Sequence, residues 1–103
     1  MNKAIILKYL ISIKAKFQQE GLLIKALFGS YSRNEATIES DVDILIEATP
    51  KFAQTYGFGA VARLREIQSE ISQALGGLPV DFADITGMGK TAKKFIVDRA
   101  IYV

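Results

Sequence analysis

The sequence contains no cysteine and no histidine among its 103 residues. Without cysteine, the chain forms no disulfide, no thiolate zinc site and no thiol nucleophile. Without histidine, it has neither a Ser-His-Asp triad nor an imidazole acid or base that works near neutral pH. Any chemistry must therefore use carboxylates, hydroxyls, lysine, arginine, backbone groups or a metal ion held by oxygen atoms.

An excess of one charge is also missing. The net charge is +2, from 13 basic and 11 acidic residues, and this value alone does not predict nucleic-acid binding. Half of the residues are hydrophobic and 23% are charged, which is typical of a globular protein rather than a disordered one. We expect a single domain over residues 1–103, small enough to lean on a partner or an oligomer.

No hydrophobic run is long enough to predict a membrane span. The N-terminal stretch Ala4–Ile13 is apolar, but Lys8 interrupts it, and a spanning helix needs roughly 20 apolar residues. No small-residue cleavage site of a signal peptide follows this stretch. We expect a cytoplasmic protein that does not use the membrane as a partner.

Hydrophobic spacing predicts alternating helices and strands. Ile6, Leu10, Ile13 and Phe17 recur at helical intervals and predict a first helix that ends before Gly21. The other expected elements are a buried strand over Leu22–Phe28, a helical turn and loop over Tyr31–Ser40, a strand over Val42–Ile46, a stretch punctuated by Pro50, Gly57 and Gly59, a helix over Val61–Leu75, a strand over Leu78–Ile85, a helix over Thr91–Arg99 and a short strand over Ala100–Val103. This order predicts an α/β (α+β) fold with a small mixed β-sheet packed against helices.

Two glycine-containing segments match only part of a nucleotide-binding pattern. Gly57–Ala62 has the spacing of a dinucleotide fingerprint, yet residues 51–56 do not predict the buried strand that must precede it. Gly89-Lys90-Thr91 resembles the end of a phosphate loop, but Asp84 occupies the position of the required glycine. We interpret both matches as chance.

A third constellation combines two elements at one fixed separation. Gly29-Ser30 closes the first strand, ten residues follow, and Asp41-Val42-Asp43 opens the second. Alternate strand positions face one side, so the Asp41 and Asp43 side chains project together from Cα atoms roughly 7 Å apart. Carboxylates this close repel each other unless a cation lies between them. Because Mg²⁺ takes carboxylate and phosphate oxygens, and two such ions can clamp an in-line displacement, the pair indicates a metal-assisted phosphate reaction.

The residues after the first strand suit an anion. Gly29 lets the backbone approach a phosphate, and Ser30 adds a hydroxyl donor with the N–H groups of a following helical turn. Arg33 is available as a charged phosphate contact. The structural alternative places the two aspartates on the outer face of an edge strand and makes Ser30 an N-cap. The combination at this spacing favours function.

The spacing of Gly29-Ser30 and Asp41-x-Asp43 resembles the signature of nucleotidyltransferases of the DNA polymerase β superfamily, and segment 29–47 resembles its minimal nucleotidyltransferase (MNT) branch. The resemblance implies a nucleotidyltransferase fold. It also implies transfer of a nucleoside monophosphate from a triphosphate to a hydroxyl, with two Mg²⁺ or Mn²⁺ ions held by three carboxylates. Two of these carboxylates map onto Asp41 and Asp43, and we assign nucleotide binding to Gly29, Ser30, Arg33 and Ser40.

The third carboxylate is expected on a neighbouring strand, where Asp81 and Asp84 are the candidates. Asp81 is out of phase with Val80 and Phe82 and so shares the polar face, whereas Asp84 is out of register with it. We assign Asp81 as the third catalytic and metal-binding residue. Asn34 stands where this branch often carries glycine, and asparagine tolerates left-handed backbone better than most residues.

The resemblance also implies a partner. Minimal members of the family resemble antitoxins paired with a HEPN-type toxin, and some transfer AMP from ATP to a tyrosine of that toxin. We predict this activity here, with a catalytically inactive binding module that neutralises its partner by contact as the alternative. A general nucleic-acid binder is not expected, because the basic segment Lys90–Lys94 is short.

Overall fold

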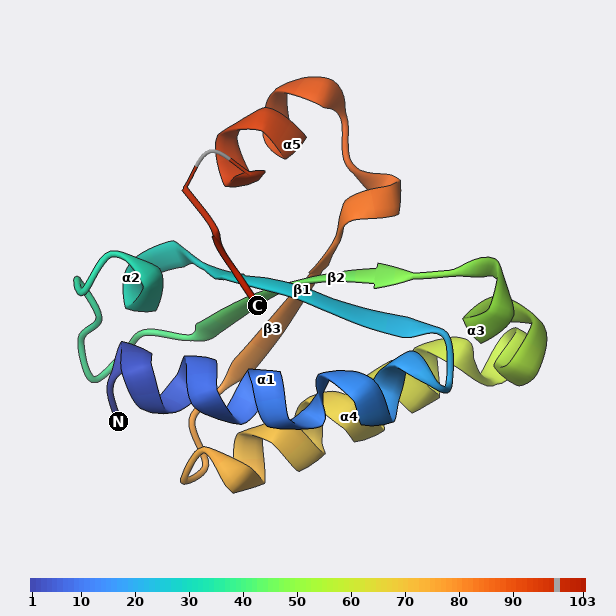
Figure 1. The fold of residues 1–103 in the computed structure, drawn as a ribbon, viewed down its shortest axis with the longest axis horizontal. Helices are drawn as coiled ribbons and strands as arrows, with labels where there is room; N and C mark the ends of the chain where they lie inside the picture. Colours follow the sequence, from blue (N-terminus) through green and yellow to red (C-terminus); the bar gives the residue numbers. More distant parts are fainter. Residues whose placement is uncertain (98) are drawn as a thin grey trace.

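The computed structural model describes residues 1–97 and 99–103 (Figure 1). Its elements, in chain order, are α1 (Lys3–Gln18), β1 (Leu22–Phe28), α2 (Gly29–Ser32), β2 (Val42–Ala48), α3 (Pro50–Tyr56), the 3-10 helix η1 (Gly57–Gly59), α4 (Ala60–Ala74), β3 (Val80–Asp84), the 3-10 helix η2 (Ile85–Gly87), α5 (Lys90–Val97) and β4 (Ile101–Tyr102). The strands form one sheet in the order β3-β2-β1-β4. β1 runs antiparallel to β2 and β4, and β2 runs parallel to β3. The expected mixed α/β architecture is confirmed.

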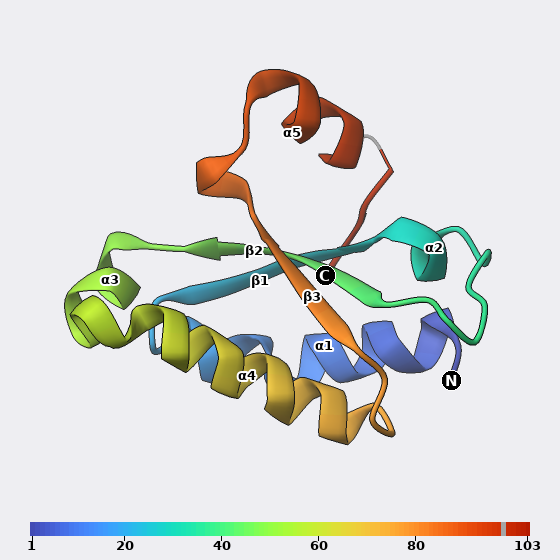
Figure 2. The ribbon, with the colours of Figure 1, turned by 180° about the vertical axis from the view of Figure 1, so that it is seen from behind.

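One face of the sheet carries the hydrophobic core. Figures 1 and 2 show α1 and α4 side by side against this face. α1 buries Ile6, Leu10 and Phe17, and α4 buries Ile67 and Ile71, because these residues recur at helical spacing on one side of each helix. From the sheet, the core receives Leu22, Ile24, Leu27, Val42, Ile44 and Ile46. Strand alternation then turns Asp43 to the opposite face.

The opposite face lies under α5, which both views show on the far side of the sheet from α1 and α4. Ala26 and Leu45 are fully buried but lie outside the main core cluster. Asp41 and Asp81 remain exposed, and Asp43 is half-buried. Polar side chains therefore gather on the face that the two long helices leave uncovered.

Several sequence expectations are met closely. β1 covers the expected range, and α1 ends before Gly21, whose φ is +90°. A Cβ at Gly21 would lie 2.6 Å from the backbone nitrogen of Phe52, so this turn requires glycine. β2 extends two residues beyond the expected end at Ile46, and β3 is shorter than Leu78–Ile85 at both ends.

Helix α3 was not expected from the sequence. Pro50 occupies its first turn, where the missing N–H costs nothing, and Phe52 anchors it in the core with 1% of its surface exposed. The glycines of the dinucleotide-like segment form η1 directly after this helix, not after a strand. The structure thus confirms that this match is chance.

At the C-terminal end, α5 and β4 correspond to the expected helix over Thr91–Arg99 and strand over Ala100–Val103. Position 98 of that expected helix lies outside the described residues. Over residues 1–97 and 99–103, no helix combines the length and the apolar character of a membrane span.

Candidate active site

Asp43 stands where three elements meet. It pairs with Phe28 at the end of antiparallel β1 and with Asp81 on parallel β3. The chain after Phe28 turns directly into α2. The sheet therefore brings two of the three predicted carboxylates into direct register, at the end of β1 that carries the Gly29-Ser30 element.

Gly29 lies against the Asp43 carboxylate. Its φ is +74°, and a Cβ built on it would lie 2.1 Å from Oδ2 and 3.0 Å from Cγ of Asp43. A side chain at position 29 would therefore take an unfavourable backbone conformation and force the Asp43 carboxylate to move. The sequence predicts a close approach of backbone to an anion here, and in the structure the approaching group is the Asp43 carboxylate.

Like charges surround Asp43. Partial burial is the largest cause that raises the pKa of Asp43 above its ordinary value, and the charges of Asp81 and Asp41 raise this pKa further. The guanidinium of Arg33 opposes them and lowers it. Ionisation of the Asp43 carboxyl group is therefore unfavourable in the folded protein. A cation placed between these acids would stabilise the ionised form.

The structure distinguishes Asp81 from Asp84 by their strand partners and hydrogen bonds. Asp84 pairs with Ile46, three residues along from the Asp43–Asp81 pair. Its Oδ1 atom accepts hydrogen bonds from the backbone N–H and the hydroxyl of Thr86, at 3.0 and 2.7 Å, and so caps η2. Asp81, not Asp84, is the β3 carboxylate beside Asp43.

Ser30 does not act as the N-cap of α2. Phe28 occupies the N-cap position and makes no side-chain capping bond, while Ser30 is the second residue of the helix. The backbone carbonyl of Ser30 accepts from the N–H of Glu35 at 2.9 Å. The structural alternative for Ser30 is therefore wrong in its detail.

A cavity of about 300 Å³ opens beside Gly29. It is lined by Phe28, Gly29, Arg33, Ile96 and Arg99. Arg33 is exposed, and its Nε atom donates to Glu35 at 3.1 Å. Sequence reasoning missed the contribution of Ile96 and Arg99, because only the return of the chain from α5 to β4 brings them next to Gly29.

The loop before Asp41 is ordered by its own side chains. The Ser40 hydroxyl accepts from the backbone N–H of Thr37 at 2.8 Å, and the backbone N–H of Ser40 donates to the Thr37 carbonyl at 3.0 Å. Asn34 adopts φ +58°, a left-handed conformation that asparagine tolerates better than most residues. Ser40 therefore acts on the shape of the loop that leads to Asp41.

The predicted metal ligands fit a hard divalent cation in their chemistry. Carboxylate oxygens are what Mg²⁺ prefers, and the pKa of Asp43 is raised first by burial and then by the charges of Asp81 and Asp41. Among the described residues, however, no three acidic side chains are already arranged to hold one ion. Since Mg²⁺ usually binds through one or two carboxylates together with substrate phosphates, the donor set fits an ion that arrives with nucleotide.

Comparison with known families matches residues 10–103 to the nucleotidyltransferase domain. The chain belongs to this family. A nucleotidyltransferase takes a nucleoside triphosphate as substrate, and domains of this family generally use divalent metal ions.

Two similar proteins agree with this assignment. This nucleotidyltransferase is 35% identical over 105 residues to a candidate protein adenylyltransferase from Methanocaldococcus jannaschii, and the match covers 98% of this chain and 93% of the relative. The solved structure of a candidate minimal nucleotidyltransferase matches with a TM-score of 0.75 at 21% identity, over 100% of this chain and 97% of that one. The second match confirms the nucleotidyltransferase fold.

Proposed function

We propose that this nucleotidyltransferase is a metal-dependent adenylyltransferase that moves AMP from ATP to a hydroxyl of a protein. The observation that carries the proposal is the in-register pairing of Asp43 with Asp81, with the Asp43 carboxylate against Gly29. A carboxyl group whose pKa is raised by burial and by neighbouring acids, as that of Asp43 is, is typical of a functional site. The choice of AMP and of a protein acceptor is supported by the candidate adenylyltransferase at 35% identity.

In this proposal the three carboxylates of Asp41, Asp43 and Asp81 hold Mg²⁺, as two ions, with Mn²⁺ as the substitute. Bound Mg²⁺ would supply neutralisation of the charge that develops on the phosphates. The metal is expected to bind weakly without nucleotide, because substrate phosphates complete its coordination.

Four residues are proposed to form the triphosphate site, three by direct contact and one by shaping a loop. Gly29 and Ser30 offer backbone and hydroxyl donors, and Arg33 offers a guanidinium at the mouth of the 300 Å³ cavity. Ser40 contributes by shaping the loop that leads into Asp41.

The proposed reaction is a single displacement. The acceptor oxygen forms a bond to the α-phosphorus of ATP, while the bond from that phosphorus to the bridging oxygen of the β-phosphate breaks. Pyrophosphate leaves with this oxygen, and the acceptor carries AMP through a phosphodiester bond. The hydroxyl proton passes to the carboxylate of Asp81, because the chain has no histidine to accept it.

The proposed acceptor is a tyrosine of a HEPN-type toxin, and modification would make this chain an antitoxin. Support comes from the signature over residues 29–47, which resembles the minimal nucleotidyltransferase branch.

One observation favours a second candidate function, a module that neutralises its partner by contact alone. In the described part of the chain, the acids do not form a ready-made three-residue metal cluster. Such a module would tolerate the loss of every acid in the site.

The deciding experiment follows label from ATP labelled at the α-phosphate to a HEPN-type partner, beside a pull-down of the same partner. Asp81→Asn keeps the shape of the side chain but removes its charge, so we expect transfer to fall by roughly 10²-fold or more. Asp84→Asn is the matched control, since Asp84 caps η2, and it should transfer label nearly as the wild type does.

The outcomes separate the alternatives. If Asp84→Asn abolishes transfer and Asp81→Asn does not, the assignment of the third carboxylate is wrong. If the wild type transfers no label while all variants bind the partner, the contact-only module replaces the enzyme.

A further inference from the structure

A second cavity lies at the beginning of α1, away from Asp43. Its volume is about 170 Å³, and it is lined by Met1, Asn2, Lys3, Tyr31, Asn34 and Ala36. Figures 1 and 2 both place the start of α1 beside α2 and the loop that follows it. Tyr31 packs into the core on the α1 side of the sheet, whereas alternation turns Asp43 to the other face. The cavity therefore belongs to neither the acids nor the 300 Å³ pocket.

Tyr31 lines this cavity, and its hydroxyl has no hydrogen-bond partner among the described residues. Only 8% of the surface of Tyr31 is exposed. Every fully buried polar side-chain atom in the described residues has a partner. The hydroxyl of Tyr31 therefore keeps some accessible surface, and Tyr31 is one of the residues that line the cavity.

The first turn of α1 adds open backbone donors. The Asn2 side chain accepts from the N–H of Ile5 at 3.0 Å, and the Asn2 carbonyl accepts from the N–H of Ile6 at 3.1 Å. The N–H groups of Lys3 and Ala4 have no acceptor among the described residues. The 16-residue helix directs its positive end to the same place.

The charge around the cavity has one sign. Lys3 lines it, and in the described part of the chain the Lys3 ammonium forms no ion pair. No lining residue is acidic. Glu35, next in the chain to Asn34, is paired with Arg33 at 3.1 Å. The cavity offers donors and positive charge without a competing carboxylate in its wall.

We propose that this cavity is a binding site for a phosphate-class oxyanion. The Tyr31 hydroxyl, the open N–H groups at the start of α1 and the Lys3 ammonium are its donors. The volume of about 170 Å³ is several times the roughly 30 Å³ of one water molecule, so a single phosphate group fits. The site goes beyond the proposed transfer reaction, and it stands whether or not that reaction is correct.

The test is a nuclear magnetic resonance titration of the full chain with sodium phosphate, without divalent metal. We expect saturable shifts of the Lys3 and Ala4 amides. Tyr31→Phe keeps the ring in the core and removes one donor to an anion, so it should weaken phosphate binding by about tenfold or more. Lys3→Gln should weaken it severalfold and flatten its dependence on salt.

Matched controls carry the same chemical changes elsewhere. Tyr102→Phe removes the hydroxyl of an exposed tyrosine on β4, and Lys8→Gln removes a charge farther along α1. Both should bind phosphate as the wild type does. Thermal melting of each variant checks folding, and Lys3→Gln, at the surface end of the helix, keeps the test valid if Tyr31→Phe melts early.

A second arm uses AMP in place of phosphate. Tighter binding of AMP with the same variant pattern identifies a nucleotide phosphate as the source, and equal binding identifies free phosphate. The proposal fails if no saturable shift appears at Lys3 and Ala4. It also fails if Tyr31→Phe and Lys3→Gln bind phosphate like the wild type, or if the Ser30 amide alone responds, because that amide lies at the candidate active site.

Discussion

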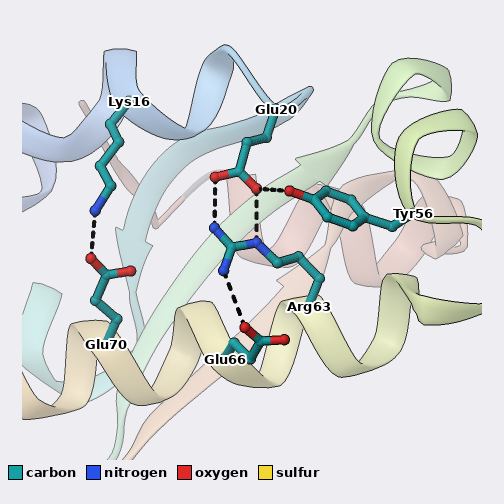
Figure 3. A network of polar contacts seen from close by, with 6 residues as sticks. All are labelled: Lys16, Glu20, Tyr56, Arg63, Glu66 and Glu70. Atoms are coloured by element: carbon teal, nitrogen blue, oxygen red, sulfur yellow. Dashed lines mark hydrogen bonds and ion pairs between the residues drawn. The ribbon is translucent and has the colours of Figure 1, made fainter.

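The two ends of β1 handle charge in opposite ways. Before β1, Glu20 receives two hydrogen bonds from Arg63, from Nε to Oε1 at 2.8 Å and from Nη2 to Oε2 at 2.7 Å (Figure 3). The Tyr56 hydroxyl donates to the same carboxylate, so α3 and α4 are both joined to the turn between α1 and β1. At the other end of β1, Asp43 on the neighbouring strand β2 pairs in register with Asp81. Among the described residues, Asp43 receives no comparable pair of hydrogen bonds. Glu20 is thus paired with hydrogen-bond donors, whereas Asp43 lies close to other carboxylates.

The pKa values follow this difference. The hydrogen bond from Arg63 is the largest cause that lowers the pKa of Glu20, while burial and the neighbouring acids raise the pKa of Asp43. A paired acid stabilises the folded chain, whereas crowded acids cost stability and are retained where a ligand needs them. The contrast supports the proposal that chemistry takes place at the Asp43 end, while Glu20 has a structural role.

Gly29→Ala is expected to have the largest effect, because it changes the Asp43 end of β1 directly. The new Cβ would displace the Asp43 carboxylate and adopt an unfavourable φ, so we expect transfer to fall more than about tenfold and unfolding to become easier by about 1–3 kcal/mol. Gly76→Ala is the control, because Gly76 has φ +73° but a Cβ added there would meet nothing within 4 Å. Equal effects of the two variants on transfer would show that contact with Asp43 is irrelevant.

Removing the Glu20–Arg63 pair should lower the stability of the fold without changing the rate of AMP transfer. Arg63→Leu leaves Glu20 without its two charged hydrogen bonds, and both side chains are only about one-fifth exposed. We expect a loss of about 2 kcal/mol in urea unfolding with an unchanged transfer rate. Lys16→Gln, which breaks the exposed Lys16–Glu70 pair, should cost less than about 0.5 kcal/mol. A fall in transfer by Arg63→Leu at full folding would contradict the separation.

Acid should erase the contribution of Glu20. Because its folded-state pKa lies below the ordinary 4.5, the stabilisation is complete above that pH and is lost as the pH falls through the folded-state pKa. The stability difference between wild type and Glu20→Gln, about 1 kcal/mol or more at pH 7, should therefore shrink in acid. Urea unfolding at stepped pH measures it, and a difference that stays constant in acid would argue against the pairing.

The smallest expected effect is a gain in stability, opposite to the loss expected at Glu20. Asp43 has a raised folded-state pKa, so the wild type loses stability as the pH rises through that pKa. Asp43→Asn removes the charge, and we expect its melting temperature at neutral pH to exceed that of the wild type by about 2–4 °C. The gap should close at low pH, where Asp43 is protonated. A lower melting temperature for the variant at pH 7 would contradict the crowding of acids.

Local patterns made much of this fold predictable. β1, the helical core positions of α1 and α4 and the left-handed Asn34 follow from hydrophobic period and backbone preference, which act within a few residues. The assignment to the nucleotidyltransferase family came from two short elements at a fixed separation. α3 was missed because its start signal, Pro50, also marks interruptions in a chain, although proline suits the first helical turn.

The sequence by itself determined which residue types could do chemistry here, since without histidine and cysteine only the oxygen and cationic groups remain. Through the two-residue period it also predicted that Asp41 and Asp43 project to the same side, and in the structure Asp41 directly precedes β2 while Asp43 lies on it. Strand alternation already favoured Asp81 over Asp84, but only the tertiary structure put Asp81 in register with Asp43, Gly29 against the Asp43 carboxylate, and Arg63 beside Glu20. Strand register and helix packing join residues far apart in the chain, and no local pattern of charge or hydrophobicity encodes these distances.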